Sequence, residues 1–295
     1  MLKKIVAAVL MTLSTAAMAA VNLGSESVLV VDNGTGKVLL EKNPDTVVPI
    51  ASLSKLMTAM VVLDTRPDMD APISIDKEDV DMLKHSKSRV PVGVTLTRRD
   101  VFQLALMSSD NRAAASLART YPGGLTAFAV AVNAKIKALG MTHTVIEEPT
   151  GLSPHNQSTA SDLIKMATAA AEYPMIREIT TSSKDLIRIN GREVEYHNSN
   201  SLVGRKGWDI GLSKTGFTNE AGRCLIMRLK TATGNATLVL LNSNANSARV
   251  SDAMNIRRFL TVGDKAEARV EAVPVTHHRR HVLQHSTPGH RRVAD

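Results

Sequence analysis

Ile50-Ala-Ser-Leu-Ser-Lys-Leu-Met57 is the stretch that decides how this chain folds, and it contains the pattern Ser52-Leu-Ser-Lys55. From this point apolar residues recur at the spacing of one helical face: Leu53, Leu56, Met57, Met60 and Val61. We therefore predict that Ser52 lies at the N-terminus of a helix. The side chains of Ser52 and Lys55 then share one helical face, within hydrogen-bond reach of each other.

The pair is suited to nucleophilic catalysis. A serine hydroxyl is a weak nucleophile, so it needs a base beside it. A lysine can be that base only if its pKa falls, which burial among apolar side chains and nearby cations bring about. The start of a helix adds a partial positive charge that favours the alkoxide. Ser52 is thus the candidate nucleophile and Lys55 the candidate general base.

A second Ser-x-x-Lys pattern, Ser74-Ile-Asp-Lys77, shows that the pattern alone is weak evidence. This copy follows Pro72 in a polar, strand-like stretch that has no apolar helical run behind it. We interpret it as a chance match, so the helical context selects Ser52.

Ser109-Asp-Asn111 is a second motif, expected at a junction between two helices. Ser109 is suited to pass a proton between the lysine, the nucleophile and a leaving group. Asn111 is suited to hold a substrate amide and to orient Lys55. Standing alone, both residues would be interpreted as a polar helix cap.

Lys214-Thr215-Gly216 is the third motif, expected at the end of a strand. Lys214 and Thr215 offer a cation and a hydroxyl to a substrate carboxylate, and Gly216 lets a substrate backbone lie close to the strand. Ser-x-Asn and Lys-Thr-Gly each occur once in the chain. All three motifs in this order indicate an active-site serine enzyme.

The order of predicted elements favours an α+β fold with an antiparallel sheet, flanking helices and an inserted helical subdomain. A hairpin opens the chain, with strands at 28–31 and 38–40. Helices are predicted from 53 and then at about 97–107, 112–119, 125–139 and 159–172, the last closed by Pro174. Strands follow at 185–189, 193–196, 210–215, 223–230 and 237–241, and a helix at about 248–259 ends the domain.

The two ends of the chain differ from its body. Residues 1–19 resemble a signal peptide, with two lysines, a short apolar run and Ala17-Met-Ala19, and we expect cleavage before Ala20 and export to the periplasm. No later run is long enough to span a bilayer, so no transmembrane anchor is expected. We assign 20–265 to the catalytic domain and 266–295 to a disordered tail rich in histidine and arginine.

Composition excludes several other classes of protein. With 295 residues and 43% hydrophobic content the chain can bury a full core. Its net charge of +8 includes +3 from residues 276–295, so no nucleic-acid partner is indicated. Cys224 is the only cysteine, which excludes an internal disulfide and favours an inert core residue. The histidines of the body form no metal-ligand spacing, and we expect neither a metal nor a cofactor.

The motifs resemble those of the penicillin-binding D-alanyl-D-alanine peptidases of low molecular mass, serine peptidase family S11. The closest likeness is to the D-alanyl-D-alanine endopeptidases of the penicillin-binding protein 7 type. The resemblance runs from about Val28 to Leu260. Besides Ile50–Met57, it is strongest in Leu106-Met-Ser-Ser-Asp-Asn-Arg-Ala113, Glu148-Pro-Thr-Gly-Leu-Ser153 and Leu212-Ser-Lys-Thr-Gly-Phe-Thr-Asn219.

The resemblance implies a β-lactamase/transpeptidase-like fold with a five-stranded antiparallel sheet, and an acyl-transfer cycle on the stem peptides of peptidoglycan. Ser52 would attack a D-alanyl carbonyl, Lys55 would take its proton and Ser109 would help protonate the leaving amine. The backbone N–H groups of Ser52 and Phe217 would form the oxyanion hole. Penicillin and other β-lactams would acylate Ser52 as covalent inhibitors.

The motifs and the resemblance leave several alternatives open. The resemblance implies an endopeptidase that cuts the link from D-alanine to diaminopimelate, with cell-wall or hydrolase partners, but a carboxypeptidase shares the same machinery. A β-lactamase is disfavoured because the loop at Glu147 and Glu148 matches the peptidases, and we expect these glutamates to shape the loop. A non-catalytic cell-wall binder would have little need for both Ser52 and Lys55.

Overall fold

The computed structural model describes residues 21–230, 234–262 and 268–269. The predicted signal peptide and nearly all of the predicted tail lie outside the described residues. Among the described residues, no helix has both the length and the apolar character needed to cross a membrane.

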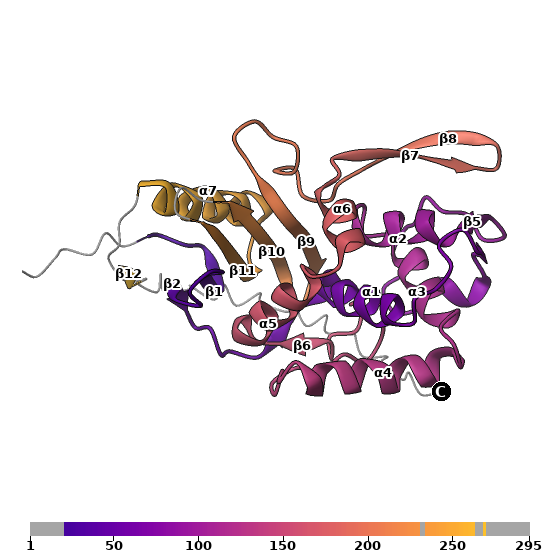
Figure 1. Cartoon of the computed structure of the whole chain (residues 1–295), viewed down its shortest axis with the longest axis horizontal. Helices are drawn as coiled ribbons and strands as arrows, with labels where there is room; N and C mark the ends of the chain where they lie inside the picture. Colours follow the sequence, from indigo (N-terminus) through magenta and orange to yellow (C-terminus); the bar gives the residue numbers. More distant parts are fainter. Residues whose placement is uncertain (1–20, 231–233, 263–267, 270–295) are drawn as a thin grey trace, which may run out of the picture.

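A central sheet with strand order β12-β2-β1-β11-β10-β9 forms one side of the molecule (Figure 1). The five predicted antiparallel strands are confirmed, and a short β12 pairs in parallel with the edge strand β2. β12 falls in the segment that the sequence analysis assigned to the tail. The strands are β1 (Ser25–Asp32), β2 (Val38–Lys42), β9 (Ile210–Thr218), β10 (Gly222–Lys230), β11 (Asn235–Ser243) and β12 (Ala268–Arg269).

Alternation along the strands gives the sheet two buried faces. Val28 and Val30 belong to the hydrophobic cluster that includes Ala253 of helix α7 (Asn246–Val262), whereas Leu29 belongs to the larger cluster on the opposite face. Cys224 is completely buried in the larger cluster, as expected for a core residue. Burial raises the pKa of its thiol to about 11, which makes it unreactive.

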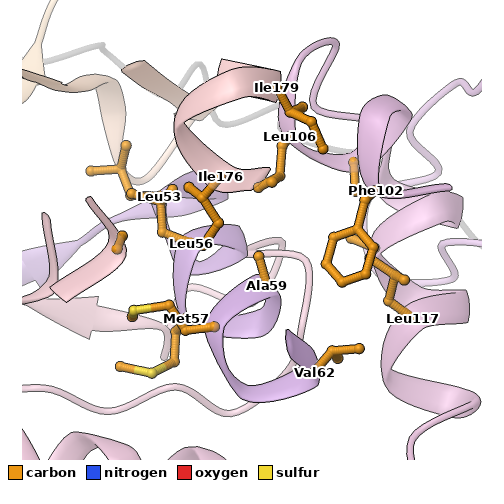
Figure 2. Close-up of a cluster of buried hydrophobic side chains, with 14 of the residues drawn as sticks. Leu53, Leu56, Met57, Ala59, Val62, Phe102, Leu106, Leu117, Ile176 and Ile179 are labelled. Carbon is orange, nitrogen blue, oxygen red and sulfur yellow. The ribbon is translucent and has the colours of Figure 1, made fainter. Parts of the chain in front are cut away.

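The larger cluster is built around helix α1 (Ser54–Asp64), which is buried from its first residue through Val62. Figure 2 shows Leu53 and Leu56 beside Ile176, and Phe102 beside Leu117. A helix that is apolar on every side is stable only inside a protein, so the neighbouring helices must enclose it. These are α2 (Arg98–Leu106), α3 (Asn111–Arg119), α4 (Gly124–Ala138), α5 (Ala160–Ala170) and α6 (Pro174–Thr181).

Helix α6 corrects one prediction. We expected Pro174 to close a helix and strands to follow, but α5 ends at Ala170 and Pro174 is the first residue of α6. Proline is favoured at the first helical position because its missing N–H has no intrahelical acceptor there. Pro174 therefore begins α6 and does not close α5, which ends at Ala170.

The remaining strands form small separate sheets. The predicted hairpin around Asn190-Gly191 is present as β7 (Lys184–Ile189) and β8 (Arg192–His197), but it does not join the central sheet. The other two pairs tie loops together within the helical subdomain. They are β3 (Val48–Pro49) with β6 (Gln157–Ser158), and β4 (Pro72–Ser74) with β5 (Thr95–Thr97).

Candidate active site

Ser52 lies in a short 3₁₀ turn, Ala51–Leu53, that runs directly into α1. Two glycines allow other segments to approach this turn closely. A Cβ atom on Gly151 would lie 2.0 Å from the Ala51 carbonyl oxygen, and one on Gly216 would lie 3.1 Å from the Ser52 nitrogen. The turn is thus enclosed by the loop at residue 151 on one side and by β9 on the other.

We expect Gly151→Ala to destabilise the fold strongly. The glycine has a φ of +85°, and its added Cβ would collide with backbone atoms that cannot move aside. Gly140→Ala is the matched control, because Gly140 has a φ of +63° with no atom within 4 Å of an added Cβ. The control should cost about 1–2 kcal/mol for its left-handed backbone alone, and Gly151→Ala clearly more. Equal losses of unfolding free energy in urea titrations would contradict this.

Lys55 lies beneath Ser52 and is almost completely buried. Its Nζ donates to Ser52 Oγ at 2.8 Å, to Asn111 Oδ1 at 2.7 Å and to the Thr150 carbonyl at 2.6 Å. Burial lowers the pKa of Lys55 to about 8, against the opposing attraction of carboxylates led by Glu148. Near neutral pH a fraction of the amine is therefore uncharged, and it can accept the Ser52 proton through the same contact.

Ser109 and Asn111 lie where α2 gives way to α3, as predicted. Ser109 has a φ of +64°, and Asp110 caps α3 by accepting from the Ala113 N–H at 3.0 Å. Asn111 accepts from Lys55 and donates from Nδ2 to Ser86 Oγ at 2.8 Å. Its amide is therefore fixed in orientation by partners on both sides.

Lys214 is the second buried cation of the site. Its Nζ donates to Ser109 Oγ at 2.8 Å and to the Thr215 carbonyl at 2.9 Å. Burial lowers the pKa of Lys214 well below its ordinary value, and the positive charges of Lys55 and Arg249 lower it further. Ser109 thus accepts from Lys214 and lines the same groove as Ser52.

Thr215 carries a contact that the sequence did not predict. Its hydroxyl donates to Ser199 Oγ at 2.7 Å. Ser199 in turn is held by its own N–H, which donates to the Met107 carbonyl at the end of α2. The loop that follows β8 therefore docks beside β9.

Glu148 organises the loop that faces Ser52. Its carboxylate accepts from the backbone N–H groups of Thr150, Gly151 and Leu152 at 2.8, 2.6 and 2.8 Å. These bonds hold the Thr150 carbonyl against Lys55. The geometry agrees with the expected shaping role.

A groove of about 680 Å³ runs over the site between the helical subdomain and the edge of β9. Ser52, Ser109, Asn111, Thr215, Gly216 and Phe217 line it, whereas Lys55 and Lys214 lie buried beneath. Sequence reasoning assigned no role to the rest of the lining: Leu152, Thr218 and Asn219 lie in stretches that carry the family resemblance, and the other six residues stand in no recognised motif. The rest of the lining consists of Lys84, Ser86, Leu152, Ser199, Thr218, Asn219, Arg223, Asn246 and Arg249.

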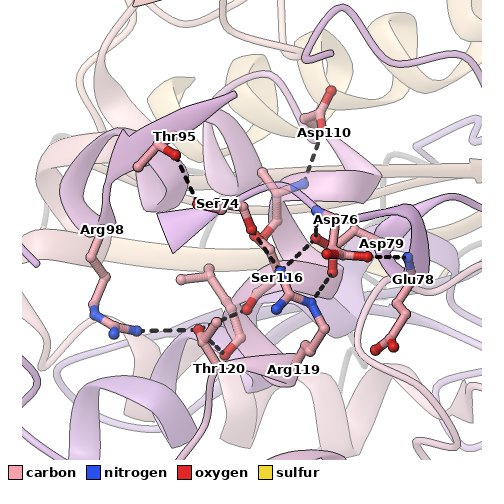
Figure 3. Close-up of polar contacts among 12 residues, drawn as sticks. Ser74, Asp76, Glu78, Asp79, Thr95, Arg98, Asp110, Ser116, Arg119 and Thr120 are labelled. Atoms are coloured by element: carbon pink, nitrogen blue, oxygen red, sulfur yellow. Dashed lines mark hydrogen bonds and ion pairs between the residues drawn. The ribbon is translucent and has the colours of Figure 1, made fainter. Parts of the chain in front are cut away.

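Ser74 lies in a different setting from Ser52. Figure 3 shows it among polar contacts, where its Oγ bonds with Thr95 Oγ1 at 2.7 Å and where Arg119 pairs with Asp79. Ser74 does not line the groove. Its Ser-x-x-Lys pattern therefore does not contribute to this site.

No group of three or more potential His, Cys, Asp or Glu metal ligands occurs among the described residues. The histidines of the predicted tail lie outside them. The donors that surround Ser52 are instead hydroxyls, amides and ammonium groups.

Comparison with known proteins agrees with this geometry. Residues 13–245 match the family model of the D-alanyl-D-alanine carboxypeptidases, peptidase S11. The chain is 47% identical to a D-alanyl-D-alanine endopeptidase of Pseudomonas aeruginosa over 85% of this chain and 80% of that protein. It is 45% identical to a D-alanyl-D-alanine endopeptidase of Escherichia coli over 82% of this chain and 78% of that protein.

A solved structure shares the fold. The crystal structure of the Streptomyces K15 DD-transpeptidase superposes with a TM-score of 0.75 at 26% identity, covering 81% of this chain and 97% of that one. The fold expected from the motifs, the β-lactamase/transpeptidase-like fold, is thereby confirmed. The chain belongs to serine peptidase family S11, the family of the D-alanyl-D-alanine carboxypeptidases.

Proposed function

We propose that this protein is a periplasmic D-alanyl-D-alanine endopeptidase that hydrolyses peptide cross-links in peptidoglycan through an acyl-enzyme on Ser52. The contact between Lys55 Nζ and Ser52 Oγ, at 2.8 Å, carries the proposal. It joins a hydroxyl to a buried amine whose pKa is lowered to about 8. The endopeptidases of Pseudomonas aeruginosa and Escherichia coli support the choice of bond.

The acylation step follows from these contacts. Ser52 Oγ attacks the D-alanyl carbonyl as neutral Lys55 takes the hydroxyl proton. The C–N bond then breaks, and the leaving amine receives a proton from the Ser109 hydroxyl, which is restored by the proton that Lys55 had accepted. An ester between Ser52 and the D-alanyl residue remains.

Two kinds of group stabilise the transition state. The backbone N–H groups of Ser52 and Phe217 bind the developing oxyanion, and such donors are typically worth ~10²- to 10³-fold in rate each. Lys214 and Thr215, with Gly216 beside them, bind the carboxylate that flanks the scissile bond. Water then cleaves the ester, releasing a new carboxylate and restoring the Ser52 hydroxyl.

β-Lactams would enter the same cycle. Their strained amide places its carbonyl at Ser52 and its carboxylate at Lys214 and Thr215. Ring opening leaves the amine tethered to the acyl group, so the ester with Ser52 persists. The groove would thus take stem peptides as substrates and penicillin as a covalent inhibitor.

Product analysis on purified cross-linked muropeptide dimers tests the proposed bond. We expect two monomers whose combined mass equals the dimer plus one water, identified by mass spectrometry. Release of a single alanine from each stem would show a carboxypeptidase instead. Binding of the dimer without any product would favour a cell-wall binder, and rapid turnover of penicillin would indicate a β-lactamase.

A further inference from the structure

The end of the groove beyond Gly216 is strongly basic. Lys84, Arg223 and Arg249 line the groove, and no aspartate or glutamate stands among its described lining residues. Lys84 is paired with Glu220 across the opening. Within the part of the chain that the structure describes, neither Arg223 nor Arg249 is paired with a carboxylate.

Arg223 is held against an exposed aromatic ring. Arg223 on β10 lies opposite Phe217 on β9 in the antiparallel pairing of these strands, which lie side by side in Figure 1. The guanidinium carbon stands 3.6 Å from the centroid of the Phe217 ring. Phe217 is 47% exposed and follows Gly216 directly in the sequence. Stacking on an aromatic face leaves the N–H edges of a guanidinium free to bind an anion.

Arg249 lies deeper and is hydrogen-bonded to other groups of the protein. It is 6% exposed, and it donates to the Cys224 carbonyl at 3.2 Å and to Asn246 Oδ1 at 2.6 Å. Burial lowers the pKa of Arg249, and the positive charge of Arg223 lowers it further. Two like charges without a counter-ion repel one another, so an anion bound between them is stabilised by both.

We propose that Arg223, stacked on Phe217, binds the leaving side of the substrate, where an aliphatic chain on the departing amine carries a further carboxylate. This inference rests on the proposed function. The ring of Phe217 offers an apolar surface for the chain, and the guanidinium of Arg223 offers paired donors for the carboxylate. The pair is a specificity determinant for the cross-link.

The chemistry of the two possible leaving groups explains why this pair would distinguish a cross-link from a terminal D-alanine. A terminal D-alanine carries a methyl group and a single carboxylate, which lies at Lys214 and Thr215. The diaminopimelate side of a cross-link carries that carboxylate and, further along its chain, more anionic groups. Only the longer leaving group extends past Gly216 to the Phe217 and Arg223 pair.

Kinetics on Arg223→Gln test the inference. The measured quantity is kcat/KM for a cross-linked dimer divided by the second-order rate constant for penicillin acylation, since penicillin lacks the long leaving chain. We expect this ratio to fall about tenfold in Arg223→Gln, as for the loss of one hydrogen bond to a charged group. Arg223→Lys, which keeps the charge but not the planar stack, should give a smaller fall.

Arg228→Gln is the matched control, because Arg228 lies on the same strand but does not line the groove. Its ratio should equal that of the wild type. An unchanged ratio in both Arg223 variants would overturn the inference while leaving the proposed function intact. Absence of penicillin acylation in the wild-type protein would instead refute the proposed function itself.

Discussion

Ser52→Ala abolishes covalent labelling of the protein by fluorescent penicillin, and it lowers hydrolysis of cross-linked muropeptides by at least about 10⁴-fold. The reason is that Ser52 supplies the oxygen of the acyl ester. No other group that bonds to Lys55 Nζ is a nucleophile that could replace it. The Asn111 oxygen and the Thr150 carbonyl, its other partners, are amide oxygens. The measurement is gel fluorescence after incubation with the labelled antibiotic.

Ser74→Ala is the control for this experiment. Ser74 begins the second Ser-x-x-Lys pattern, and its Oγ bonds with Thr95 on an exposed strand pair. This variant should label as the wild type does. Labelling of Ser52→Ala at the wild-type level would show that the nucleophile is another residue.

Lys55→Met lowers the rate constant of penicillin acylation by about 10²- to 10⁴-fold, the usual contribution of a general base. Methionine fills a similar volume in the buried site but cannot accept a proton. Lys77→Met, at the lysine of the second pattern, should leave the rate constant unchanged, because Lys77 lies outside the groove lining. A wild-type rate constant in Lys55→Met would show that Lys55 is not the general base.

The pH profile of the wild-type enzyme gives an independent measure of the pKa of Lys55. A base must be unprotonated to act, so the acylation rate constant should rise with pH and level off above about 8, the lowered pKa of Lys55. A lysine at the ordinary value of 10.5 would keep the profile rising more than two units further. A profile without a plateau up to pH 10 would contradict burial as the source of catalytic activation.

Sequence alone could predict those parts of the site that depend on local geometry. Ser52 and Lys55 are three residues apart, so one helical turn brings them together whatever the rest of the chain does. The motif order then suggested that Asn111 and Lys214 would join them. The structure places Asn111 on Lys55 and Lys214 on Ser109.

Other parts depend on tertiary packing and carry no local signal. Arg223 and Arg249 line one groove only because α7 packs on the central sheet, and neither arginine stands in one of the three motifs. Ser199 reaches Thr215 because its loop docks on the Met107 carbonyl. Pro174 was ambiguous for a different reason, since proline both ends helices and begins them.

Mass spectrometry of the acyl-enzyme tests directly whether Ser52 is the nucleophile. The protein is incubated with penicillin, digested, and the modified peptide sequenced by fragmentation. We predict one added penicillin mass per chain, located on Ser52 and absent from Ser52→Ala. An adduct on Ser74, on Ser109 or on Cys224, or muropeptide hydrolysis that persists in Ser52→Ala, would contradict it.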